Sequence, residues 1–180
     1  MVARSAQTPC RSRRPGDASG LVLMGRTAEA RRAVTTAWRE GRVEKRYLAL
    51  VEGAPEGETF TIETPIGPVS HPRLGTVHAV SPTGKPSTSH VRRLAIRNDQ
   101  TLVEVSIPTG RPHQIRIHLA AAGHPLVGDP LYGKGGLPAP APALPGEGGF
   151  WLHSHRLALT HPANGAPIEL ECPPPPPLRP

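Results

Sequence analysis

The chain has 180 residues, with 21 Lys and Arg against 14 Asp and Glu, a net charge of +7 and a pI of about 10.4. This length predicts one domain with a sizeable core. No apolar run approaches the roughly 18 residues of a membrane span and no signal-peptide pattern is evident, so the sequence predicts a cytoplasmic protein and excludes a membrane-spanning helix.

The first half of the chain predicts one helix and several strands. Residues 1–16 are polar and basic and predict irregular structure, and the apolar run 21–24 predicts a short buried strand. Thr27 can cap a helix that continues to about Glu40, because apolar residues recur on one face at helical spacing. The residues of that face are Ala30, Ala33, Val34, Ala37 and Trp38.

The remaining elements are mostly strands. Strands are expected at 46–51, 59–63, 76–80, 87–96, 102–107, 151–159 and 167–171, with 87–96 and 102–107 forming an antiparallel pair. A Pro- and Gly-rich loop is expected at 138–149, and the run Pro173 to Pro177 predicts an extended tail. This pattern predicts an α+β fold with a mostly antiparallel sheet and few helices, in a single domain of residues 1–172 followed by a Pro-rich tail at 173–180.

The stretch from Thr109 to Gly133, TGRPHQIRIHLAAAGHPLVGDPLYG, is the most informative part of the chain. Pro112 suits a first helical turn and Gly123 a helix stop, which predicts a short helix, although the alternation of apolar residues at 115, 117 and 119 leaves a strand open. Arg111 and Arg116 flank the first turn, near the positive end of the helix dipole. Two cations at that place favour a neighbouring anion, either a phosphate or a buried carboxylate.

This stretch resembles the TGR-x-HQIR-x-H…GHP…GD-x-x-Y signature of the RluA-type pseudouridine synthases. Four further blocks resemble the family in the same order, so that the resemblance covers roughly residues 13–172. They are SGLVLMGRT at 19–27, KRYLALVEG at 45–53, GKPSTSHVRRL at 84–94 and LHSHRLALTHP at 152–162. The resemblance implies a pseudouridine-synthase-like fold and the isomerisation of uridine to pseudouridine in ribosomal or transfer RNA, with no metal and no organic cofactor.

The resemblance also implies three roles for site residues. Tyr47 matches the tyrosine of K-x-YLALV, which packs on the base, and Arg116 matches the arginine of HQIR, which keeps a catalytic carboxylate ionised. Without the resemblance, Tyr47 would be taken for a core residue and Arg116 for a surface cation. The basic charge fits an RNA partner, with Arg111, His113, Arg92 and Arg93 as candidate RNA-binding residues, although a coding bias toward arginine gives the same charge. The protein is expected to act as a monomer.

The catalytic aspartate is where the sequence departs from the family motif HRLD-x-x-TSG. An ungapped match places Pro15 at the aspartate position, and Asp17 lies two residues downstream. Asp17 is therefore the candidate nucleophile, and its other interpretation is a turn aspartate after Pro-Gly. The family's strands before this motif have almost no counterpart here, which predicts either an N-terminally short member or a misplaced start.

Two other functions compete with the isomerase interpretation. The first is a catalytically inactive RNA-binding relative of the ribosome-assembly type, which Pro15 favours. The second is a metal-dependent hydrolase that would use His113, His118, His153 and His155. The sequence contains no HExxH motif for such an enzyme.

Overall fold

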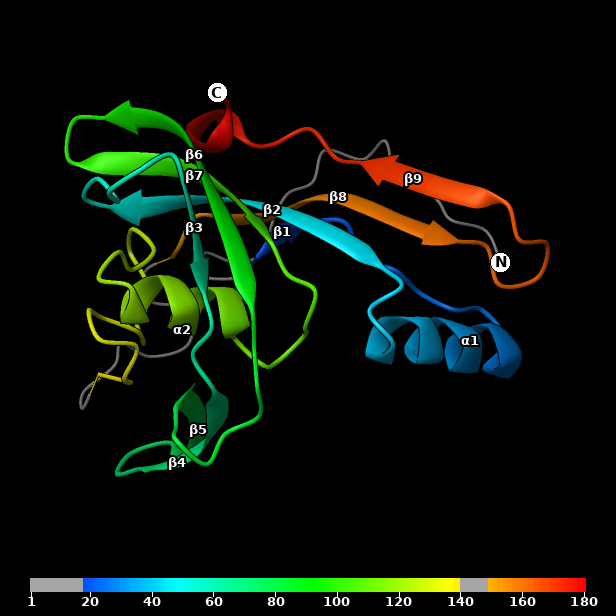
Figure 1. The fold of residues 1–180 in the computed structure, drawn as a ribbon, viewed down its shortest axis with the longest axis horizontal. Coiled ribbons are helices and arrows are strands. Elements are labelled where there is room, and N and C mark those ends of the chain that lie inside the picture. Colours follow the sequence, from blue (N-terminus) through cyan, green and yellow to red (C-terminus); the bar gives the residue numbers. More distant parts are fainter. Residues whose placement is uncertain (1–17, 140–148) are drawn as a thin grey trace.

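The structure is a computed structural model that describes residues 18–139 and 149–180 (Figure 1). The irregular segment expected at 1–16, and all but the ends of the loop expected at 138–149, lie outside these residues. Among the described residues, no helix is long and apolar enough to cross a membrane.

The architecture is a seven-stranded, mostly antiparallel sheet with a separate two-stranded hairpin, which confirms the predicted α+β class. Strand order in the sheet is β1-β8-β2-β7-β6-β3, and β9 pairs with the C-terminal half of β8. Among these strands, only β1 runs parallel to its neighbour. The sheet strands are β1 (Ser19–Gly20), β2 (Glu44–Glu52), β3 (Thr59–Ile62), β6 (Ser89–Arg97), β7 (Gln100–Ser106), β8 (Leu152–Thr160) and β9 (Pro167–Glu171). The hairpin consists of β4 (Ile66–His71) and β5 (Gly75–Val80).

Two helices lie on one side of the sheet, α1 (Ala28–Arg39) and α2 (Gln114–Ala121), beneath opposite ends of β2 in Figure 1. Alternation along β2 separates two cores, because successive side chains point to opposite faces. Ala49 and Val51 pack with Leu119 of α2, whereas Leu48 and Leu50 pack with Leu178 on the other face.

The helix expected from Thr27 is confirmed, because the Thr27 hydroxyl accepts a hydrogen bond from the Ala30 N–H at 3.1 Å and the helix ends at Arg39. The buried strand expected at 21–24 is wrong. Val22 and Met24 are 81% and 75% exposed, and strand pairing stops at Gly20. Leu21 and Leu23 pack under α1, so the run is half-buried by alternation rather than buried throughout.

The C-terminal residues differ from a simple extended tail. Residues Pro176–Leu178 form a 3₁₀ turn, η1, and Leu178 is fully buried against the sheet. Arg97 of β6 donates hydrogen bonds to the carbonyl groups of Pro177 and Arg179, which fastens this segment to the sheet. The prolines therefore end in an anchored turn.

Candidate active site

The loop before α2 is built around the side chain of Gln114, which is 3% exposed. Its carbonyl oxygen accepts hydrogen bonds from the Thr109 hydroxyl at 2.9 Å and from the Arg111 N–H at 3.0 Å. Its amide donates to the carbonyl oxygen of Thr88 at 2.8 Å. Every polar atom of this amide is thus used to fix the loop, which makes Gln114 a structural residue.

Arg116, in the first turn of α2, forms a bidentate ion pair with Asp129. The Nε and Nη2 atoms lie 2.7 and 2.6 Å from the two carboxylate oxygens, and the side chains are 11% and 1% exposed. The guanidinium also lies over the rings of Tyr132 and Phe150, at 4.9 and 4.4 Å from their centroids. A planar guanidinium that is paired through two nitrogens is held in one orientation. The third nitrogen, Nη1, takes no part in the pair.

Asp129 is a site residue that sequence reasoning missed. It belongs to the GD-x-x-Y part of the signature, and that spacing is the signal that could have identified it. Its carboxylate also accepts hydrogen bonds from the N–H groups of Leu131 and Tyr132 at 2.9 and 3.1 Å. The carboxylate therefore fixes the following loop and Arg116 together.

Tyr47 and Arg116 line one cavity of about 310 Å³, which is within the size range of small-molecule sites. Arg111, His113 and Ala18 line the same cavity, together with Ile107, Gln114, Ile115, Phe150 and Leu152. Burial raises the pKa of the Tyr47 phenol, against a hydrogen bond with Ser154 that lowers it, so the phenol is protonated at neutral pH. Four of the residues singled out in the sequence therefore lie at one place.

Two of the remaining predicted residues, Arg92 and Arg93, do not line this cavity. Arg92 is exposed on β6 and pairs with Glu104 at 3.1 Å, and Arg93 donates to the carbonyl oxygen of Pro55 at 2.9 Å. Both arginines are on β6, and neither lines the cavity. Asp17 lies outside the described residues, so its distance from Arg116 stays a prediction.

The residues directly after Asp17 are held at the cavity by β8. The Ser19 hydroxyl lies 2.8 Å from His153 Nδ1, and His153 Nε2 lies 3.0 Å from the Cys172 carbonyl oxygen. Since a carbonyl only accepts, Nε2 carries the proton and Nδ1 accepts from Ser19. Gly20 follows with φ of 105°, and a Cβ there would approach the Ser154 carbonyl oxygen to 2.2 Å, so this close approach requires glycine.

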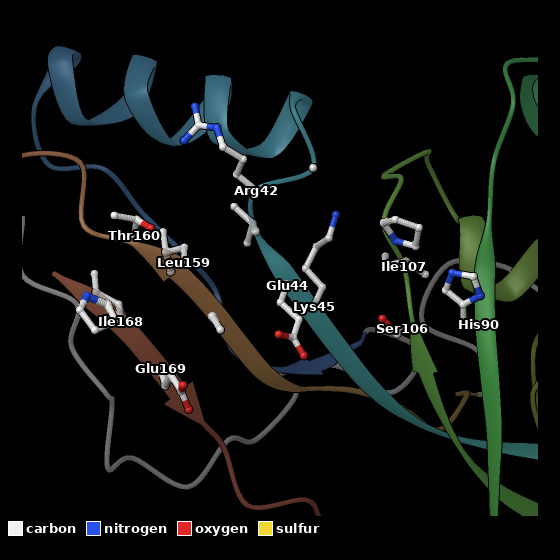
Figure 2. A pocket seen from close by; sticks show the side chains of 15 residues that line it. Arg42, Glu44, Lys45, His90, Ser106, Ile107, Leu159, Thr160, Ile168 and Glu169 are labelled. Atoms are coloured by element: carbon white, nitrogen blue, oxygen red, sulfur yellow. The ribbon is translucent and has the colours of Figure 1, made fainter. Parts of the chain in front are cut away.

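A second cavity of about 470 Å³ lies beside the first, between the end of α1 and β9, and Ile107 lines both (Figure 2). Figure 2 shows Lys45 extending from β2 toward α1. Its ammonium lies 4.9 Å above the Trp38 ring and 3.5 Å from the Thr109 carbonyl oxygen, and burial lowers its pKa. Neither Tyr47 nor Arg116 lines this cavity, so the first cavity is the candidate active site.

The histidines of the alternative hydrolase do not gather into a metal centre. In the parts of the chain that the structure describes, no group of three or more His, Cys, Asp or Glu side chains is placed to hold a metal ion. His118, for example, is fully buried, and both of its ring nitrogens are hydrogen-bonded, Nδ1 to Ser89 Oγ at 2.8 Å and Nε2 to the Thr64 carbonyl oxygen at 2.9 Å. The geometry gives no support to that hydrolase.

Comparison with known proteins gives one consistent result. The family model for RNA pseudouridylate synthase matches residues 16–121. An uncharacterized RNA pseudouridine synthase of Synechocystis sp. is 44% identical over 161 residues, which is 89% of this chain and 55% of that protein. Ribosomal large subunit pseudouridine synthase D of Nitrosomonas europaea is 40% identical over 87% of this chain and 45% of its own length. The chain thus spans about half the length of the curated relatives it matches.

Solved structures agree at the level of the fold. Human RNA Pseudouridylate Synthase Domain Containing 1 superposes with a TM-score of 0.61 at 26% sequence identity, covering 86% of this chain and 64% of that one. Human RNA Pseudouridylate Synthase Domain Containing 4 has a TM-score of 0.63 at 21% identity, over 84% and 66% of the two chains.

Proposed function

Because this chain belongs to the RNA pseudouridylate synthase family, we propose that it is an enzyme that isomerises uridine to pseudouridine in RNA. The observation that carries the proposal is the cavity that Tyr47 and Arg116 share with Ala18, the residue next to Asp17. In the reaction the bond between N1 of uracil and C1′ of ribose breaks, a bond between C5 and C1′ forms, and the C5 proton leaves to solvent. N1 takes up a proton in exchange, so substrate and product are isomers and no oxidant or reductant is needed.

The roles follow from the chemistry of the three side chains. The Asp17 carboxylate acts as the nucleophile toward the ribose edge, and Arg116 keeps it ionised. Tyr47, which is protonated and half-buried, packs on the base after the nucleotide has been flipped out of its stack. A cavity lined by one phenol, two arginines and apolar walls supports this division of roles.

The Arg116–Asp129 pair supports the role of Arg116. Because Asp129 uses Nε and Nη2, the guanidinium is already oriented before a substrate arrives, and Nη1 is left to face a second carboxylate. Preorganised charge of this kind contributes to catalysis because no reorganisation is needed during the reaction.

The RNA itself is proposed to be ribosomal or transfer RNA. Ribosomal RNA is favoured by the name of one relative, ribosomal large subunit pseudouridine synthase D. The net charge of +7 suits a polyanion, and Arg111, His113, Arg92 and Arg93 are the proposed RNA contacts. We place the protein in the cytoplasm as a monomer.

The test is direct detection of the product. Ribosomal and transfer RNA transcripts that contain no pseudouridine are incubated with the protein, digested to nucleosides and separated by chromatography with mass detection. We expect pseudouridine in one of the two RNA classes in proportion to enzyme and time. RNA binding without any pseudouridine would identify the inactive RNA-binding relative that Pro15 favours.

A further inference from the structure

His113 lines the candidate active site and has an unusual backbone conformation. It caps the N-terminus of α2 with φ of 55° and ψ of 18°, in the left-handed region that few non-glycine residues adopt. It makes no side-chain cap bond to the helix, so capping does not explain its presence. Residues held in such conformations concentrate at functional sites, where the surrounding structure fixes them.

The ring of His113 is fixed by Tyr132. Nδ1 lies 2.9 Å from the Tyr132 hydroxyl oxygen, and that hydroxyl lies 2.7 Å from the carbonyl oxygen of His78. A carbonyl only accepts and a phenol has one proton, so Tyr132 donates to His78. The same oxygen must then accept from His113, which places the imidazole proton on Nδ1.

The other ring nitrogen is consequently an acceptor. In the neutral imidazole with its proton on Nδ1, Nε2 carries a lone pair and no proton. No hydrogen bond to Nε2 of His113 occurs among the described residues, and His113 lines the cavity that Tyr47 and Arg116 share. The charged and titratable groups that face the ring are Arg116, Asp129, His78 and Tyr132.

The site is otherwise rich in donors. Arg111 and Arg116 offer only N–H groups, and the protonated Tyr47 adds a hydroxyl. A nucleoside carries donors of its own, the N3–H of uracil and the 2′-hydroxyl of ribose, which need an acceptor once they leave water. A hydrogen-bond acceptor with one fixed tautomer fits that need.

We propose that His113 Nε2 accepts a hydrogen bond from the target nucleotide. The hydrogen bonds from His113 to Tyr132 and from Tyr132 to the His78 carbonyl oxygen keep Nε2 an acceptor. This inference rests on the proposed function for the identity of the nucleotide. It makes His113 a specificity-determining residue, because a site with a fixed acceptor rejects a nucleotide that lacks the matching donor.

The test measures binding and does not depend on turnover. Three short oligoadenylates are compared, with a single central uridine, 3-methyluridine or 2′-deoxyuridine, so that each modified probe removes one donor. The variant is His113→Asn, because asparagine tolerates the left-handed conformation and its amide can still donate to Tyr132. Thermal unfolding checks that the variant folds.

We expect the wild-type protein to bind one modified probe about three- to tenfold more weakly than the uridine probe, the effect of one neutral hydrogen bond. The probe that loses affinity identifies the donor. His113→Asn should bind the three probes equally. Discrimination by the variant equal to that of wild type, or no discrimination by wild type, would overturn the inference.

A second measurement uses only the wild-type protein, so it tests the inference even if the variant fails to fold. Protonation turns Nε2 into a donor, so the discrimination of the wild-type protein should disappear as the pH falls through the range where His113 titrates. Desolvation of the ring and the charge of Arg116 lower the pKa of His113, which places that loss below about pH 6.5. Discrimination that persists unchanged after an NMR titration shows the His113 ring to be protonated contradicts the inference.

The failure of this inference is distinct from failure of the proposed function. If the wild-type protein forms pseudouridine but does not discriminate between the probes, the proposed function stands and the proposed role of His113 is wrong. If discrimination depends on His113 but the protein forms no pseudouridine, the role of His113 as an acceptor stands and the proposed isomerase function is wrong.

Discussion

Asp17 is the residue on which the catalytic account depends most. In the sequence it is the only acidic residue before Ser19, and Pro15 stands at the position that the family motif gives to the aspartate. The segment that follows it, Ala18 to Gly20, is held at the cavity by β8 and by the Ser19–His153 hydrogen bond. Ala18 and Arg116 line the same cavity, which supports the proposal that Asp17 supplies the carboxylate.

Asp17→Asn should remove isomerase activity and leave RNA binding within about twofold, since the amide keeps the shape and cannot act as a nucleophile. Product formation and RNA affinity are measured on the same preparation. Asp99→Asn, in the exposed turn between β6 and β7, is the matched control and should behave as wild type. Full activity in Asp17→Asn would show that another group is the nucleophile.

Asp129 should matter for stability as much as for catalysis. Asp129→Asn leaves Arg116, which is 11% exposed, without its counter-charge, and breaking a buried pair in this way costs about 3 kcal/mol of unfolding free energy. Urea denaturation measures this loss. The control is Glu40→Gln, whose pair with Arg42 has both side chains more than half exposed and should cost under about 1 kcal/mol. Equal losses in the two variants would contradict the structural role of Asp129.

At the scale of elements, the C-terminal turn is an anchor for the sheet. Leu178 is fully buried against Leu48, Leu50 and Leu102, on the face of β2 opposite to α2. Leu178→Ala should lower the free energy of unfolding by about 2–5 kcal/mol, because it removes buried methyl groups and leaves a cavity. Leu137→Ala, at a position 59% exposed, is the control. Similar small effects of both substitutions on chemical denaturation would mean that the tail does not hold the sheet.

Periodicity predicted the elements that have one buried face. The helix after Thr27 and the strands β2, β6 and β8 were all recognisable, because their apolar residues repeat at 3.6 or 2 residues. Strand β4 was not, because glycine and proline at 67 and 68 interrupt its pattern and it pairs only within the hairpin. The burial of Leu178 depends on contacts with distant strands, which no local pattern contains.

The site was predictable in part, and by a different signal. Tyr47 and Arg116 were identified through motif resemblance, and the structure brings both to one cavity. The partner of Arg116 was left open in the sequence as a phosphate or a carboxylate, and the structure shows Asp129. The tautomer of His113 could not be predicted from the sequence, because it follows from two hydrogen bonds between residues far apart in the chain.

At the scale of the whole molecule, two buried histidines link stability to pH. Burial is the main cause that lowers the pKa of His118 and of His153. Their pKa in the unfolded chain is near 6.5, so on acidification the unfolded state binds protons first. Stability should therefore be fully present above about pH 6.5 and decline as the pH falls below it. Urea unfolding between pH 5 and 8 checks this, and a flat profile over that range would contradict it.

The excess positive charge should make the affinity for RNA depend on salt concentration. Binding to structured RNA is expected to weaken steeply with salt, because phosphate contacts release counterions. Substitution of Arg111, Arg92 or Arg93 by alanine should each reduce the slope of log affinity against log salt by about 1 if that residue contacts phosphate. An affinity that is flat from low to moderate salt would show that the +7 charge reflects composition alone.

The central claim is that the cavity of Tyr47 and Arg116 isomerises uridine, and release of the C5 proton tests it most directly. Ribosomal RNA carrying tritium at C5 of uridine is incubated with wild-type protein and with Arg116→Lys, which keeps the charge and loses the bidentate fork that Asp129 orients. The account predicts time-dependent tritium release by wild type and a loss of at least about 100-fold in the variant, the scale on which a preorganised electrostatic group contributes. No release by wild type from RNA that it binds, or equal release by the variant, would contradict the account.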